Sequence, residues 1–163
     1  MPGVGKASLL LVLGIVLTAC SVSLGTGEEQ EINAGTGDQQ REVVAAARRV
    51  AGHLDEGRYG EVWASTGPML RSRSTQEQFI ANLVLIRKPL GRGGQRDIRG
   101  FSFPTELEGH TGEFGLVALG TDFERLENVE EKFVFQRIES EWKLVGYFVS
   151  TTVTLGDDDS AAQ

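Results

Sequence analysis

The chain has 163 residues and a net charge of −7, from 16 basic and 23 acidic side chains. Its length suits one modest domain behind a leader, and an apolar fraction of 40% is enough to build a hydrophobic core. The acidic balance argues against a nucleic-acid partner, because binding to phosphates needs a basic surface. The only cysteine is Cys20, which excludes an intramolecular disulfide.

Residues 1–19 have the features of an export signal peptide. A short basic start precedes the apolar run 9–17, whose nine residues are too few to span ~30 Å of hydrocarbon as a helix. The stretch Leu17-Thr18-Ala19-Cys20 is similar to a bacterial lipobox. That resemblance implies cleavage between Ala19 and Cys20, lipid transfer to the thiol, and acylation of the new amine. The alternatives are an ordinary secretory signal cut near Ala19 and an uncleaved anchor.

Lipidation at Cys20 would make the chain a lipoprotein of the bacterial cell envelope. Two or more acyl chains hold a protein stably on a membrane, whereas one holds it only marginally. Ser21 directly follows the cysteine, and the lipobox resemblance then implies the outer membrane, facing the periplasm, if the host is Gram-negative. The expected location is therefore outside the cytoplasm, with the membrane as the first partner.

Behind the leader we expect three segments. Residues 20–37 are rich in Gly, Ser, Thr and Glu and are expected to form a flexible tether, with an r.m.s. reach of roughly 20–25 Å. Packing of part of this tether on the domain is the alternative. Residues 38–154 are expected to form a single α+β domain, and the acidic residues 155–163 a disordered tail.

The first half of the domain is predicted to contain three helices. The first covers about 38–56, with Asp38 as the candidate N-cap and Gly57 as the stop. Its apolar residues recur at helical spacing and predict a buried stripe: Val43, Ala47, Val50 and Leu54. The second helix, 59–65, is short and ends before the breaker Gly67-Pro68.

The third helix has the clearest start signal in the chain. Ser74 is the candidate N-cap, and Glu77 stands three residues later, as a capping box requires. Phe79, Leu83 and Ile86 form its apolar stripe, and Pro89 ends it.

From residue 91 onward the pattern changes from helices to strands. Four β-rich segments predict strands: 95–103, 113–123, 128–138 and 142–153. A polar loop is expected over 105–112. Helices followed by consecutive strands predict an α+β domain, in which three N-terminal helices pack on a four-stranded antiparallel meander.

Several short motifs between residues 42 and 149 stand in a recognisable order. They are Asp55-Glu56-Gly57-Arg58-Tyr59 with Trp63, then Phe79, Arg87-Lys88-Pro89-Leu90-Gly91, Arg96, Phe123, Glu131 and Trp142-Lys143-Leu144-Val145-Gly146-Tyr147. This order resembles a bacterial family of exported domains of unknown function, the one numbered four thousand and nineteen. The resemblance implies no established activity. It is also similar to a cystatin-like, nuclear-transport-factor-like roll, an analogy at the level of fold alone.

One segment departs from that family. Glu139-Ser140-Glu141 stands where the family places Asp-Gly. The departure removes the turn glycine that a tight type I′ hairpin prefers.

No motif in the chain predicts catalysis, a cofactor or a metal. Nucleophilic catalysis needs a nucleophile beside a base, and Cys20 is consumed by lipid. His53 and His110 have no second ligand at helical spacing and no neighbouring cysteine. We therefore expect no cofactor and no metal, and we favour a protein that is not an enzyme.

A basic cluster lies around the end of the third helix: Arg87, Lys88, Arg92, Arg96 and Arg99. It could bind anionic headgroups, an acidic partner or a ligand carboxylate. We favour the alternative, in which these charges complement the helix dipole and pair with the acidic segment 127–131. Arg96 lies among large apolar residues of a predicted strand, and because a buried arginine needs a partner, Glu131 is the candidate.

Five residues are candidates for a pocket or a basic patch between helices and sheet: Trp63, Arg87, Arg96, Trp142 and Tyr147. An ordinary filled core is the alternative. The leading hypothesis is a membrane-anchored, non-enzymatic module that binds an envelope protein or another envelope component. The second hypothesis is a small-ligand-binding or enzymatic domain with a cavity between helices and sheet.

Overall fold

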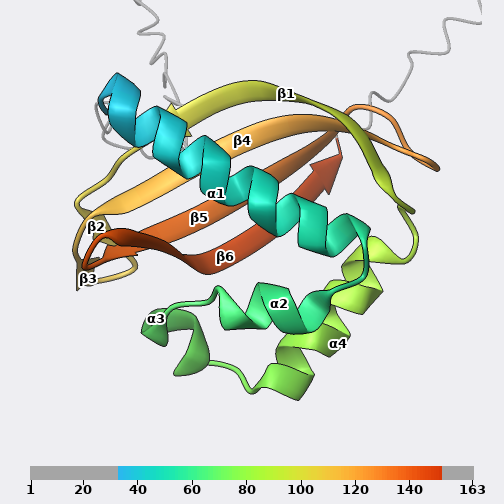
Figure 1. The fold of residues 1–163 in the computed structure, drawn as a ribbon, viewed down its shortest axis with the longest axis horizontal. Coiled ribbons are helices and arrows are strands. Elements are labelled where there is room, and N and C mark those ends of the chain that lie inside the picture. Colours follow the sequence, from blue (N-terminus) through green and yellow to red (C-terminus); the bar gives the residue numbers. More distant parts are fainter. Residues whose placement is uncertain (1–32, 152–163) are drawn as a thin grey trace, which may run out of the picture. The chain divides into compact units, whose positions relative to one another are not determined.

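The computed structural model describes residues 33–151 (Figure 1). The lipobox with Ala19 and Cys20, the tether up to residue 32 and the tail 155–163 lie outside the described residues, so those assignments stay predictions. Within 33–151, no helix is both long enough and apolar enough to cross a membrane.

The described residues form an α+β domain, as predicted. Its helices are α1 (Gly37–Asp55), α2 (Tyr59–Ala64), α3 (Pro68–Arg71) and α4 (Gln76–Arg87). Its strands are β1 (Gly93–Ser102), β2 (Glu106–Leu107), β3 (His110–Thr111), β4 (Phe114–Phe123), β5 (Val129–Ile138) and β6 (Glu141–Thr151). Four long strands form one antiparallel sheet in the order β1-β4-β5-β6. The one-turn helix α3 and the small hairpin β2–β3 were not predicted.

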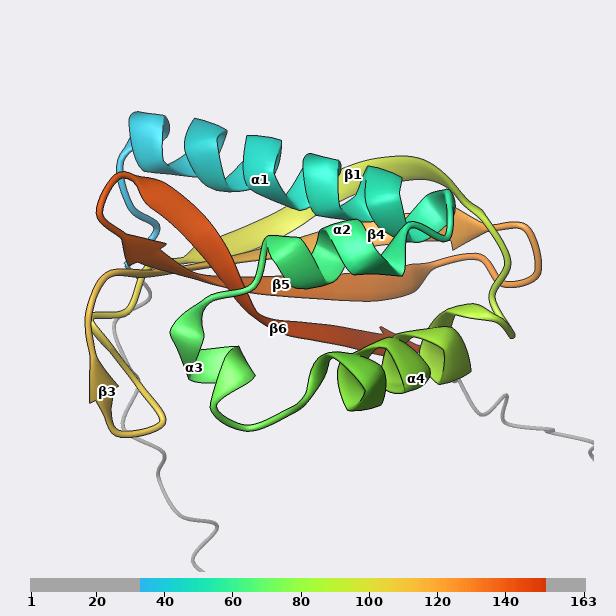
Figure 2. The ribbon, with the colours of Figure 1, turned by 60° about the horizontal axis from the view of Figure 1, so that its bottom comes forward.

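The helices pack on one face of a curved sheet and around one of its edges. α1 crosses that face (Figure 1), and α3 and α4 lie beside the edge strand β6 (Figure 2). The predicted stripe of α1 is buried, with Val43 and Ala47 fully inaccessible. It packs in one core with Phe133 and Phe135 of β5. No helix of the described residues lies on the other side of the sheet (Figure 1, Figure 2).

Both long helices begin one or two residues away from the predicted caps. The N-cap of α1 is Thr36 rather than Asp38, and its side chain forms a capping box with Gln39. The end of α1 is as predicted. Gly57 has a φ of +69°, and its N–H donates to the Leu54 carbonyl at 3.1 Å, as in a helix that ends through a left-handed glycine.

The N-cap of α4 is Thr75 rather than Ser74. The Thr75 hydroxyl accepts from the Gln78 N–H at 3.3 Å, and the Gln78 side chain accepts from the Thr75 N–H at 3.1 Å. The sequence contains two overlapping capping boxes, because Glu77 follows Ser74 by three residues and Gln78 follows Thr75 by three. Thr75 takes the extended backbone that an N-cap requires.

Two connections differ from expectation. Asn33, in the predicted tether, hydrogen-bonds to Phe103 through both its carbonyl, at 2.8 Å, and its side-chain amide, at 3.1 Å. Glu139 and Ser140 form a two-residue turn between β5 and β6. The tight turn is therefore kept without the glycine, with Glu139 at a φ of +57°.

Candidate functional site

Six side chains from six different elements meet in a buried network of ion pairs and hydrogen bonds. They are Asp55 at the end of α1, Arg87 at the end of α4, Arg96 of β1, Thr121 of β4, Glu131 of β5 and Tyr147 of β6. The side chain of Glu131 is fully inaccessible and that of Arg87 is 2% exposed. Burial of this depth is tolerated only when every charge is paired.

Glu131 is the centre of the network and accepts four hydrogen bonds. Its Oε1 accepts from Arg87 Nη1 at 2.9 Å and from the Tyr147 hydroxyl at 2.6 Å. Its Oε2 accepts from Arg96 Nε at 2.7 Å and from the Thr121 hydroxyl at 2.6 Å. The predicted pairing of Arg96 with Glu131 is therefore confirmed, and both carboxylate oxygens are saturated.

Asp55 joins the same two arginines from the other side. Arg96 donates to it through Nη1 at 2.7 Å and Nη2 at 2.9 Å, and the Gly93 N–H adds a bond at 3.1 Å. Arg87 pairs with the same carboxylate through Nη2. Burial alone would raise the pKa of Asp55, but the hydrogen bonds and charge of Arg96, with help from Gly93 and Arg87, lower it.

Arg96 and Tyr147 are held in the protonation states that their hydrogen bonds require. Burial works against the charge on Arg96, but Asp55 and Glu131 outweigh it and raise the pKa of Arg96. Burial and the negative charge of Glu131 raise the pKa of Tyr147 far above that of a free phenol. The Tyr147 hydroxyl donates to Glu131 Oε1, and its oxygen accepts from Arg87 Nη1 at 3.2 Å.

The network is a closed structural clamp rather than a ligand site. Its two arginines balance its two carboxylates, and the bonds among them join both helix ends to the sheet. Within the clamp, Arg87 Nε is a buried atom with no hydrogen-bond partner among the described residues, and its guanidinium lies 4.5 Å from the centre of the Phe123 ring. A side chain at Gly93 would collide with Arg96 and Asp55. The charges of the clamp are thus paired with one another.

The five predicted pocket residues do not form one site. Arg87, Arg96 and Tyr147 come together in the clamp. Trp63 instead packs on Phe79, with ring centres 5.5 Å apart. Trp142 donates through Nε1 to Glu42 at 3.0 Å. Trp63 and Trp142 thus have other partners than the three clamp residues, and of the five only Tyr147 also lines the groove described below.

The predicted basic cluster is also divided by the fold. Arg87 and Arg96 turn inward to the carboxylates, whereas the remaining three, Lys88, Arg92 and Arg99, are exposed. The inward pair meets Glu131 of the acidic segment, which agrees with the alternative that we favoured. The cluster is therefore not a single surface.

The histidines take no part in the clamp. His53 is half-buried on α1, and its Nδ1 has no partner among residues 33–151, while His110 is exposed in β3. In the same range, no three His, Cys, Asp or Glu side chains gather closely enough to hold a metal ion.

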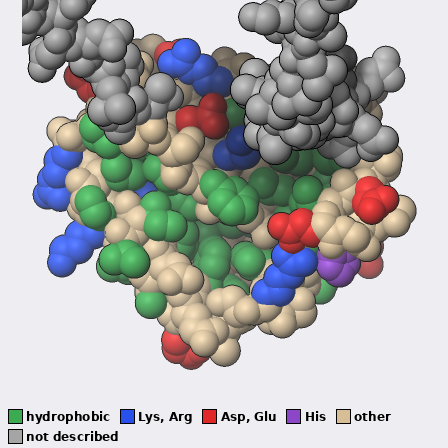
Figure 3. All heavy atoms as spheres, turned by 180° about the vertical axis from the view of Figure 1, so that it is seen from behind, with side chains coloured by type: hydrophobic (Ala, Val, Ile, Leu, Met, Phe, Trp, Pro, Cys, Tyr) green, Lys and Arg blue, Asp and Glu red, His purple; other side chains and the backbone are tan. Residues whose placement is uncertain are grey.

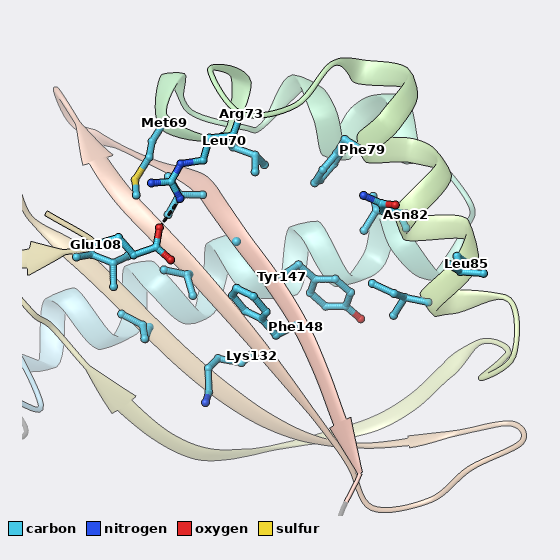
Figure 4. A pocket seen from close by; sticks show the side chains of 17 residues that line it. Met69, Leu70, Arg73, Phe79, Asn82, Leu85, Glu108, Lys132, Tyr147 and Phe148 are labelled. Carbon is cyan, nitrogen blue, oxygen red and sulfur yellow. Dashed lines mark hydrogen bonds and ion pairs between the residues drawn. The ribbon is translucent and has the colours of Figure 1, made fainter. Parts of the chain in front are cut away.

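A separate feature is an open apolar groove beside β6. It has a volume of about 660 Å³ and runs between the edge of β6 and helices α3 and α4 (Figure 4). Its lining is mostly hydrophobic: Met69, Leu70, Phe79, Leu83, Leu85, Ile86, Leu107, Leu116, Val134, Val145 and Phe148, with Tyr147 and Gly146 of β6. On the face of the molecule opposite α1, hydrophobic side chains surround and line a hollow (Figure 3).

The groove exposes large apolar side chains that a core would bury. Leu85 of α4 is 75% exposed, and Phe148 of β6 is 57% exposed. Arg73 and Glu108 form an ion pair at one end, and Lys132 is the other cation of the lining (Figure 4). The arrangement is an apolar trough with a few charged side chains in its lining, which is typical of a binding surface.

Sequence reasoning missed the groove, although a signal was present. The run Leu83-Val84-Leu85-Ile86 is continuously apolar, so a helix there cannot turn all four side chains toward one core. The last strand likewise places apolar residues at successive positions, Tyr147 and Phe148, which point to opposite faces. Asp55 and Thr121 of the clamp carried no such signal.

The comparison with protein families gives one match, over residues 46–147, to the family described as Protein of unknown function (DUF4019). This is the family that the resemblance named. The match includes every residue of the clamp and begins within α1. No curated protein matches the chain. Because the matched region is more than half of the chain, the protein belongs to the DUF4019 family.

Proposed function

We propose that the protein is a lipid-anchored component of the bacterial cell envelope, and that its domain acts by binding rather than by catalysis. The anchor is Cys20, carried by the lipobox-like sequence. The binding surface is the groove between β6 and helices α3 and α4. The observation that carries the proposal is the exposure of Leu85 and Phe148 in one apolar trough.

Exposed hydrophobic surface of this kind raises the free energy of the protein in water. Covering it would gain about 25 cal/mol for each Å² of apolar area removed from solvent. Of the large hydrophobic side chains exposed in the described region, three line the groove: Leu85, Ile86 and Phe148. A surface that gathers such residues, with a few charges in its lining, favours a partner over simple solvation.

The alternative function, a ligand or substrate held between helices and sheet, has less support. The region around Arg96 and Tyr147 is occupied by the clamp, and the core residues next to it are buried. The donors and acceptors that would bind a polar ligand are already paired with each other. A small apolar ligand would therefore enter the groove, and not the interior.

The anchor can be tested separately from the groove. We expect the uncut chain to accumulate when lipoprotein signal peptidase is inhibited. We also expect Cys20→Ala to release the chain from the membrane fraction. A conservative control is Ser23→Ala, which leaves the lipobox intact. If the Cys20→Ala chain is processed normally and stays with the membrane, lipid anchoring at this residue is refuted.

The groove can be tested in the envelope itself. A photo-crosslinking amino acid is placed at position 85 or 148 of the acylated full chain. The control positions are 98 and 126, where the native side chains, Ile98 and Leu126, are 46% and 42% exposed and do not line the groove. We expect discrete adducts only from the groove positions. Equal crosslinking from all four positions would contradict the proposal.

A further inference from the structure

We infer that the groove binds an extended polypeptide segment, which adds as a strand to the open edge of β6. The segment would be apolar at alternate positions and carry an acidic residue. This inference rests on the proposed function, because it names the ligand of the same groove.

The first support is that the edge of β6 itself lines the groove. β6 is the last strand in the order β1-β4-β5-β6, so only β5 pairs with it along its length. Four consecutive residues of β6, 145–148, line the groove. Because successive side chains of a strand point to opposite faces, four consecutive lining residues mean that the edge of the strand itself borders the groove. Among them Phe148 is exposed and Val145 half-buried, whereas Gly146 and Tyr147 are buried.

The second support is that this edge already accepts one strand-like contact. The Leu144 N–H donates to the Ser65 carbonyl at 2.9 Å, and the Gly67 N–H donates to the Leu144 carbonyl at 2.9 Å. Together they form a parallel bridge between Thr66 and Leu144. The chain then turns away, because Pro68 begins α3. An added segment would continue this ladder along residues 145–148, beyond the point where the protein's own chain leaves it.

The third support is that apolar surfaces flank the edge on both sides. On the sheet face away from the core, Leu116 pairs with Val134, and Val134 pairs with Gly146, with Phe148 next along that face. On the helix side stand Leu85 and Ile86 of α4. Alternate side chains of an added strand would reach the two surfaces in turn, which is how strand addition obtains specificity.

The fourth support is the charge of the groove. Its ionisable lining consists of Arg73, Lys132, Glu108 and the phenol of Tyr147. Glu108 is paired with Arg73. Lys132 has only a long contact with Glu130, at 3.8 Å and at the surface. The groove therefore has one positive charge in excess, at Lys132, and electrostatic complementarity favours an acidic residue in the segment.

Two other occupants fit these observations less well. An acyl chain would cover the backbone of residues 145–148 without offering hydrogen bonds, and burying unpaired amide groups is costly. A second copy of the domain would bring its own α3 and α4, which stand beside its β6, against the same helices here. A single extended segment can hydrogen-bond to the edge of β6 and fits between that strand and the helices.

The test begins with random linear peptides displayed on phage and selected on the mature chain, residues 20–163 carrying Cys20→Ser, which retains every described contact. We expect enriched peptides with apolar residues at alternate positions and an acidic residue. A synthetic peptide of the enriched sequence is then measured for its Kd by fluorescence anisotropy. Hydrogen exchange, measured with and without this peptide, should slow at those amides of residues 145–148 that point away from β5, because strand addition pairs these outward N–H groups while the others already pair with β5.

Matched variants locate the site. Phe148→Ser and Lys132→Glu should each weaken binding of that peptide, by about tenfold and about fivefold. Ile98→Ser and Arg125→Glu, which change exposed residues outside the groove, should leave the Kd within about twofold. All four are surface changes, and circular dichroism checks that each variant folds.

Each other result overturns the inference. Enriched peptides with apolar residues three and four apart would indicate a bound helix. If no peptide is enriched but the chain binds phosphatidylglycerol vesicles, and Phe148→Ser abolishes that binding, the occupant is lipid. If the chain dimerises and Phe148→Ser abolishes the dimer, the occupant is a second copy. Binding seen only after removal of residues 152–163 would assign the groove to that segment. In these cases crosslinking from the groove positions would still support the proposed binding function. Failure of the peptide inference can therefore be told apart from failure of the proposed function.

Discussion

Replacing Glu131 by glutamine tests the role of the clamp most directly. The two side chains have the same shape, but the amide has no charge and presents an NH₂ group where one carboxylate oxygen stood. Both oxygens accept from one arginine and one hydroxyl. Whichever way the amide faces, its NH₂ group meets an arginine N–H that can only donate, and the hydroxyl beside it must turn to accept. The change therefore breaks bonds without removing side-chain volume.

The expected cost follows from the burial of the partners. In Glu131→Gln, Arg87 and Arg96 would share only Asp55, so one buried positive charge loses its partner. Removing one member of a buried ion pair costs roughly 3–5 kcal/mol, while a domain has about 5–15 kcal/mol in total. The side chains of Arg87 and Glu131 are 2% and 0% exposed, so solvent offers no relief.

The assay is urea unfolding of the mature chain, followed by tryptophan fluorescence. The control is Glu108→Gln, which breaks an ion pair whose side chains are about half exposed. Such a surface pair is worth about 0–1 kcal/mol. We expect the Glu131 variant to lose several times more unfolding free energy than the control. Equal losses would refute the view that the clamp holds the helices on the sheet.

Three further predictions concern the clamp and the helix ends. The pKa of Asp55 is lowered on folding, so its stabilising contribution is complete above its unfolded value of about 3.9 and is lost as pH falls through the lower folded value. Asp55→Asn should therefore flatten the pH dependence of the unfolding free energy below about pH 4, measured by urea unfolding at a series of pH values; an unchanged profile would argue against this origin. Thr75→Ala should cost about 1 kcal/mol and Ser74→Ala much less, because only Thr75 caps α4; the reverse order in thermal melts would restore Ser74 as the cap. Gly57→Ala should lower Tm because Gly57 has a φ of +69°, whereas Gly60→Ala, within α2 and with open space around it, should raise Tm slightly.

Local patterns in the sequence were sufficient for most of the fold. The stripe of α1 and the four long strands are visible as periodicity, because side-chain spacing reports which face meets the core. Gly57 identified the end of α1 because few other residues adopt its backbone conformation. Within the described residues, the strand ends differ from the predicted ones by at most two residues; the predicted end of the last strand, at residue 153, lies outside them. The N-cap of α4 was misplaced by one residue, because its two overlapping capping boxes have nearly equal local energies.

One part of the clamp was also readable from the chain. An arginine among apolar strand residues must find a carboxylate, so Arg96 pointed to Glu131. The lipobox-like sequence at Cys20 remains the basis of the proposed location, because it depends on consecutive residues and not on folding.

The rest of the clamp and the groove were decided by tertiary structure. Asp55 and Thr121 look like ordinary surface or strand residues, and only the meeting of α1 and β4 with the sheet interior gives them their partners. The groove arises because β6 is an edge strand and α4 lies beside it. Sequence determined which segments are helices and strands through local, periodic interactions; strand order and helix placement depend on contacts between distant residues, and these decided what is buried and what stays open to a partner.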